Sequence, residues 1–171
     1  IEGGFSVSYG NDFSILNKKK SLDIFNLKLA NNLRLKENDD LPRTNQIGAK
    51  TSNFFGEISI NPSKYLSSTY NTSLENNLKD VTYENLETKL SINNFVTTFD
   101  FVNENNTKEK NSYLKNTTSY NLDETNSLLF STRKNKKTDL TEYYNFMYQY
   151  KNDCLAASIE YNKDYYTDRD I

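Results

Sequence analysis

The side chains best suited to chemistry in this sequence are one cysteine, Cys154, and scattered carboxylates, because the 171 residues include no histidine. Histidine is the commonest general base and metal ligand near neutral pH, so its absence weighs against most hydrolytic and metal-dependent activities. The sequence also has no glycine-rich phosphate-binding loop and no G-x-S-x-G nucleophile motif. Asp139 and Glu142 could form a carboxylate pair, but sequence spacing alone does not establish that two acids flank a sugar ring. We therefore expect no catalytic residue, no cofactor, no metal and no enzymatic activity.

Other charged clusters carry weaker signals. An acidic group near the end is compatible with a divalent cation, but it lacks the glycine and spacing of a calcium loop, and a solvated loop explains it better. Two basic runs are compatible with contacts to lipid phosphates, but ordinary hydrated turns explain them better. The acidic group is Glu160, Asp164, Asp168 and Asp170, and the basic runs are Lys18–Lys20 and Arg133–Lys137. Cys154 follows Asn152-Asp153, residues typical of a turn, and by residue type alone it is compatible with a small buried thiol.

The elements that must position these residues show an alternation of apolar and polar residues with a period of two. Phe5, Val7 and Tyr9 alternate with polar residues, as do Phe95–Phe101 and later Tyr144–Tyr150. Such alternation gives each strand one apolar face and one hydrated face. We predict strands over Glu2–Ile15, Leu22–Lys36, Ile47–Lys50, Phe54–Asn61, Tyr65–Leu78, Val81–Ile92, Phe95–Val102, Tyr113–Leu122, Ser127–Arg133, Glu142–Lys151 and Cys154–Tyr165.

Composition favours a membrane wall over a soluble core. Only 35% of the residues are hydrophobic and the mean hydropathy is −0.84, yet 13% are aromatic, with 13 Tyr and 10 Phe. Disordered chains of this polarity are poor in aromatic residues, whereas transmembrane barrels combine a wet lumen with aromatic girdles. The tyrosines Tyr143, Tyr144, Tyr148, Tyr150, Tyr161, Tyr165 and Tyr166 suit such a girdle, and a β-sandwich core is the alternative. The net charge of −2 gives no reason to expect nucleic acid as a partner.

The sequence therefore predicts an all-β, antiparallel transmembrane β-barrel wall of about ten or eleven strands. No run of about 18 apolar residues is present, which excludes a helical membrane span, and we expect no signal peptide within these residues. The abrupt ends, Ile1-Glu2 and Asp170-Ile171, lead us to expect that residues 1–171 are a fragment of a large outer-membrane barrel.

Three segments resemble the LptD family of lipopolysaccharide-assembly proteins, also called organic solvent tolerance proteins. They are Leu33–Pro42, Phe55–Tyr70 and, most specifically, Tyr150–Tyr161, which is similar to a late hairpin of the family with a cysteine in its turn. The resemblance implies that residues 1–171 are the C-terminal part of the barrel domain. It implies that a periplasmic domain and the first strands lie upstream and that the closing strand lies downstream.

The resemblance also implies a role for Cys154. In that family, cysteines at this hairpin pair with cysteines of the N-terminal part, in an oxidising compartment where a bridge over a long loop restricts the unfolded chain. Here Leu155 follows Cys154 in place of a second cysteine. At most one such bridge starts in this turn, and its partner lies outside this sequence.

The function implied is lipopolysaccharide transport in the outer membrane of a Gram-negative bacterium. Lipopolysaccharide would cross a hydrated lumen and leave through a lateral seam, with a lipoprotein plug (LptE-like) and a periplasmic Lpt bridge as partners. Two alternatives remain open: a porin or TonB-type solute barrel, and a soluble or surface β-sandwich binding module. A one-residue slip in register reverses the faces of a strand, so the sequence leaves the lumen-facing residues unassigned.

Overall fold

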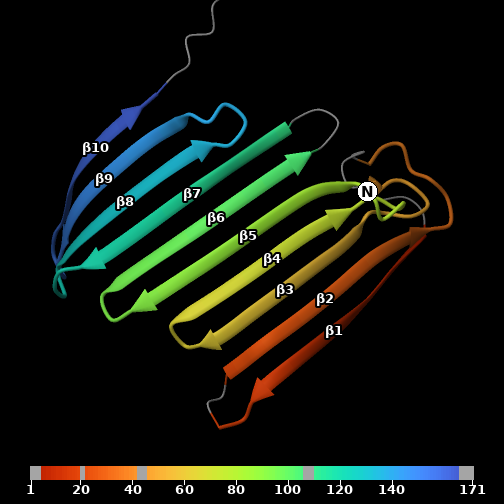
Figure 1. The fold of residues 1–171 in the computed structure, drawn as a ribbon, viewed down its shortest axis with the longest axis horizontal. Coiled ribbons are helices and arrows are strands. Elements are labelled where there is room, and N and C mark those ends of the chain that lie inside the picture. Colours follow the sequence, from red (N-terminus) through yellow and green to blue (C-terminus); the bar gives the residue numbers. More distant parts are fainter. Residues whose placement is uncertain (1–4, 20–21, 42–45, 106–109, 166–171) are drawn as a thin grey trace, which may run out of the picture.

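The computed structural model describes residues 5–19, 22–41, 46–105 and 110–165. These residues form one antiparallel sheet of ten strands, in which each strand pairs with the next one along the chain (Figure 1). The strands are β1 (Ser6–Asn17), β2 (Leu22–Arg34), β3 (Phe54–Ser63), β4 (Leu66–Leu74), β5 (Val81–Ile92), β6 (Phe95–Asn105), β7 (Lys110–Asn121), β8 (Asn126–Asn135), β9 (Thr141–Lys151) and β10 (Ala156–Asp164). The prediction of an all-β antiparallel fold is confirmed.

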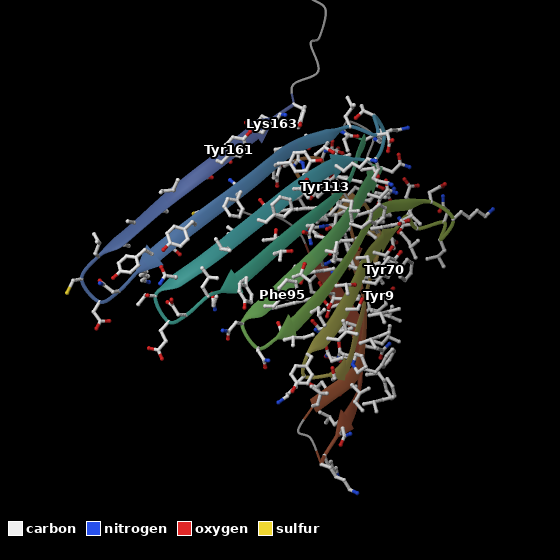
Figure 2. The ribbon with its side chains drawn as sticks, turned by 60° about the vertical axis from the view of Figure 1, so that its left-hand side comes forward. Tyr9, Tyr70, Phe95, Tyr113, Tyr161 and Lys163 are labelled. Atoms are coloured by element: carbon white, nitrogen blue, oxygen red, sulfur yellow. The ribbon has the colours of Figure 1, made fainter. Side chains whose placement is uncertain are left out.

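The sheet is a single curved layer with two open edges. Figure 2 shows β7–β10 broad side on and β1–β4 nearly edge on, so the two halves of the sheet lie at an angle. Within the described residues β1 pairs only with β2 and β10 only with β9, so the sheet is not closed. No helix in this part of the chain has the length and apolar character needed to cross a membrane.

The two ends of the sheet differ in their connections. At one end, called here the short-turn end, the strands are joined by residues 18–21, 64–65, 93–94, 122–125 and 152–155. At the other, the long-loop end, the connections include the segments 35–53, 75–80 and 136–140. Figure 1 shows these two sets of connections at opposite ends of the strands.

Asparagine and aspartate side chains shape the short turns. Asn93 adopts a φ of 50° in the two-residue β5–β6 turn, a conformation that asparagine tolerates. In the β7–β8 turn the Asp123 carboxylate accepts hydrogen bonds from the backbone N–H groups of Thr125 and Asn126, both at 2.8 Å. These bonds, with one from the Thr125 hydroxyl, lower the pKa of Asp123 to about 2.

Two predicted features are wrong. Residues 47–50, predicted as a strand, belong instead to the β2–β3 loop, where the carbonyls of Ile47 and Gly48 accept hydrogen bonds from Arg34 Nε and the Asn38 N–H, both at 2.8 Å. Pro62 was expected to stop its strand, but β3 continues through it. The register of β3 against β4 shifts between Ile60 and Ser63, so the proline lies where no regular ladder bond is required.

Candidate functional surface

The cross-strand register separates the sheet into two faces of different character. One face carries a row of seven apolar side chains, one from each of β1 to β7. The row is Phe13, Leu27, Ile58, Tyr70, Leu86, Phe101 and Leu114. We call the face to which this row belongs the apolar face. The apolar face continues over β8–β10 with Phe130, Phe146 and Tyr161, which pair with one another across these three strands.

Large side chains of the apolar face lie open to the surroundings. Phe13, Phe99, Phe146 and Tyr161 are 56%, 48%, 45% and 63% exposed. Tyr9, Tyr70, Phe95 and Tyr161 can be followed on this face in Figure 2. Contiguous exposed apolar surface on this scale marks contact with a membrane or another protein, because isolated soluble domains rarely present it. The apolar face is therefore the candidate functional surface of the chain.

The opposite side, called the polar face, carries charges and amides along the middle of the strands. One cross-strand row of the polar face consists of the chain neighbours of the apolar row from β1 to β7. These residues are Asp12, Lys28, Glu57, Asn71, Asn85, Val102 and Tyr113. Lys28 Nζ lies 2.9 Å from Glu57 Oε1, and the Asn85 amide donates to the Asp100 carboxylate. Cross-strand hydrogen bonds of this kind satisfy polar groups on a hydrated sheet surface.

The polar face is hollowed near its β2–β5 part. A hollow of about 530 Å³ is lined there by Lys28, Phe55, Asn71 and Tyr83, with the buried Ser73 between the two rings. Val102, the buried apolar side chain of the described residues, lies on this face between Asn85 and Tyr113. Larger apolar groups of the polar face are thus more enclosed than those of the apolar face.

Charged side chains on the apolar face are confined to the long-loop end. The pairing beside the β1–β2 turn is irregular from Leu16 on and is left aside. Elsewhere the charged residues of the apolar face are Glu84, Lys110, Lys134 and Lys163. Each lies within the four residues of its strand nearest the long loops. The middle of the apolar face carries threonine, serine and asparagine as its polar residues. Sequence reasoning missed this set because face and depth depend on the register of neighbouring strands.

Cys154 lies in the β9–β10 turn at the short-turn end, and its side chain is exposed and not in a disulfide within the chain. The Asn152 side chain closes this turn by accepting hydrogen bonds from the N–H groups of Cys154 at 3.0 Å and Leu155 at 2.7 Å. A small thiol buried in a core, one reading of the sequence, is therefore not what the described turn contains. An exposed thiol in this turn is accessible to another cysteine.

The other predicted clusters do not form compact sites. Arg133 and Lys134, which begin the predicted basic run, are both strand residues of β8 and lie on opposite faces. Arg133 lies on the polar face over the rings of Tyr113 and Tyr143, with its guanidinium carbon 5.0 and 6.0 Å from their centroids. Lys134 lies on the apolar face.

The acids have separate partners in the part of the chain that the structure describes. Arg133 pairs with Glu142, and Lys134 Nζ lies 2.7 Å from Asp139 Oδ1, so these two acids do not face a common site. Glu160 accepts a hydrogen bond from Asn145 on the polar face, while Asp168, Asp170 and Lys20 lie outside the described residues. No group of metal-ligating side chains occurs within the described ranges.

The predicted tyrosine girdle divides between the faces. Tyr144, Tyr148, Tyr150 and Tyr161 lie on the apolar face, whereas Tyr143 lies on the polar face and Tyr166 is outside the described residues. The pairings Thr132–Tyr144 and Arg133–Tyr143 establish this division. The Tyr144 and Tyr165 rings are in edge contact, with centroids 5.9 Å apart.

The sequence matches no protein-family model and no curated protein.

Proposed function

We propose that this chain forms part of the wall of an outer-membrane β-barrel. The observation that carries the proposal is the apolar face, a continuous set of exposed large apolar side chains backed by a face of charges and amides. A bilayer covers such a face with acyl chains, while water fills the space on the other side. The strands are nine to thirteen residues long, and about 9–11 residues suffice for a tilted strand to cross the hydrocarbon core.

The connections favour one orientation in the membrane. Outer-membrane barrels have short turns on the periplasmic side and longer loops outside the cell. By this rule the short-turn end, with Cys154, faces the periplasm, and the 35–53 loop faces the exterior. The two open edges imply further strands of the same protein, because a bilayer cannot hydrogen-bond the unpaired edges of β1 and β10.

Within this class we propose the lipopolysaccharide translocon. The support is the resemblance of Tyr150–Tyr161 to the LptD hairpin, together with an exposed Cys154 at the end assigned to the periplasm. The segment would contribute wall, lumen surface and mouth loops, and conduction would require no catalytic residue. The proposed partners are lipopolysaccharide, an LptE-like lipoprotein plug and the periplasmic Lpt bridge, in the outer membrane of a Gram-negative bacterium.

Fractionation of cell envelopes tests the membrane proposal, and depletion tests the transport proposal. The full-length protein should be found in the outer-membrane fraction and require detergent for extraction. Its depletion should leave newly made lipopolysaccharide unexposed at the cell surface while porins remain inserted. A porin or TonB-type receptor would instead lose uptake of a solute with normal lipopolysaccharide export. A protein that stays soluble without detergent would overturn the barrel and favour the β-sandwich module.

A further inference from the structure

We infer that the long-loop end of the apolar face binds the phosphate groups of anionic lipid headgroups through Lys110, Lys134 and Lys163. This inference rests on the proposed membrane wall, because it requires the apolar face to lie against lipid. It adds a chemical preference for the headgroups that surround the wall at this end. The observation behind it is the one-sided distribution of charge on an otherwise uncharged face.

The charges of this face are predominantly positive. Three of the four charged residues confined to the long-loop end are lysines, and the fourth, Glu84, lies on β5, separated from β7 by one strand. Uncharged residues occupy the same face from there to the short turns. A lysine at the edge of an apolar surface buries its methylene stem and extends the ammonium group to the polar layer. The three lysines therefore extend ammonium groups toward the polar layer at the long-loop end, with Lys110 four residues farther in that direction along β7 than Leu114, the partner of Lys134.

Aromatic rings adjoin the lysine of β10. Lys163 Nζ lies 4.9 Å from the ring centroid of Tyr165, which contacts Tyr144, and Tyr144 in turn lies 6.4 Å from Phe130 between centroids. Tyrosine concentrates where hydrocarbon meets headgroups, because its ring is apolar and its hydroxyl is polar. The patch thus has an acyl-chain contact in Phe130, two interfacial tyrosines and a cation beyond them.

The geometry allows two lysines to serve one headgroup. Lys134 and Lys163 lie on strands separated only by β9, or about 10 Å at the usual spacing of strands. Lys134 is paired with Asp139, but both side chains are substantially exposed, at 41% and 79%, so this pair is weak. An ammonium group has three donors, and the Asp139 carboxylate occupies one. A phosphate oxygen can accept from the others.

Lipid selectivity measured by electron paramagnetic resonance tests the inference. The full-length protein would be reconstituted in phosphatidylcholine vesicles containing a trace of spin-labelled phosphatidic acid or spin-labelled phosphatidylcholine. The fraction of label immobilised at the protein surface gives the relative association of the two lipids. We expect a preference of at least about twofold for phosphatidic acid, since lysines near a membrane surface attract anionic lipid headgroups.

Two triple variants separate this surface from the net charge of the protein. Lys110→Gln, Lys134→Gln and Lys163→Gln together should abolish the preference. Lys89→Gln, Lys115→Gln and Lys151→Gln remove the same charge from the polar face and should leave it unchanged. No preference in the wild-type protein, or equal losses in both variants, would overturn the inference while leaving the wall intact. The absence of any immobilised lipid would instead overturn the proposed membrane wall.

Discussion

Ile15 on β1 and Lys163 on β10 lie on one cross-strand row of the apolar face. The row passes from Ile15 through the paired residues of the eight strands between and arrives at Lys163. Ile15 is two residues from the short-turn end of its strand, whereas Lys163 is one residue from the long-loop end of its own. The strands are therefore staggered progressively across the sheet. Such a stagger accompanies the tilt of strands in a barrel wall.

Accessibility along β5 should alternate residue by residue. In a Cys154→Ser background, spin labels placed singly over Leu86–Leu90 report collisions with oxygen, which concentrates in lipid, and with a water-soluble nickel complex. We expect oxygen to dominate at Leu86, Thr88 and Leu90 and nickel at Glu87 and Lys89, because the register assigns them to opposite faces. Low collision rates with both reagents on the apolar face would indicate a dry protein core and favour the sandwich.

An arginine in the middle of the apolar face should destabilise the inserted protein. Phe99→Arg is expected to lower the free energy of unfolding in vesicles by about 2–4 kcal/mol, the cost of a cation facing lipid near the bilayer midplane. Phe99 is 48% exposed, so the substitution requires little repacking. Its control, Thr98→Arg, adds the same charge to the polar face and should have a much smaller effect. Urea titration measures both, and equal destabilisation would contradict the assignment of faces.

Cys154 should be oxidised in the native envelope. Without reductant, the full-length protein is expected to migrate differently on a denaturing gel than after reduction, because a long-range bridge keeps the unfolded chain compact. Cys154→Ser should abolish this difference in migration. If the full-length protein has other disulfides, the substitution should instead change the size of the difference. A maleimide probe that labels Cys154 fully in unreduced envelopes would show a free thiol and remove the bridge from the proposal.

The contribution of Asp123 to stability should be lost only in strong acid. Its pKa is lowered from 3.8 to about 2 in the folded turn by hydrogen bonds from Thr125 and Asn126. A depressed carboxylate stabilises the folded state above the pKa of the unfolded chain, and the effect disappears as the pH falls through the folded pKa. The stability difference between wild type and Asp123→Asn should thus be constant above about pH 4 and shrink toward pH 2. A pH-independent difference would contradict the lowered pKa.

The sequence predicted the elements of this fold better than their faces. Val81–Ile92 and the Asn93-Asn94 turn were predicted with the observed bounds, because the alternation over Leu86–Ile92 runs directly into turn residues. On β7, by contrast, Asn116 and Thr118 belong to the apolar face, and only their pairing with Phe99 and Thr97 reveals it. The predicted strand at residues 47–50 failed because local apolar residues cannot compete with hydrogen bonds to Arg34 and Asn38.

The candidate surface depended on the same information. Composition and alternation indicated a hydrated face and an apolar face. The lysines of the long-loop end, however, are distributed over β7, β8 and β10, far apart in sequence. Their common face arises from the register of the strands from β6 to β10. Periodicity describes each strand alone and therefore cannot show that these three lysines lie on one surface.

Because every strand pairs with its predecessor in the chain, the sheet can be built in the order in which it is synthesised. Each new strand pairs with the strand just before it in the chain and closes a loop of no more than 19 residues, the length of segment 35–53, which favours rapid pairing over long-range search. The edge at which the sheet grows is always its most recent strand. A protein that guides insertion therefore needs to hold only one unpaired strand at a time. An interruption after any hairpin would leave the earlier strands correctly paired.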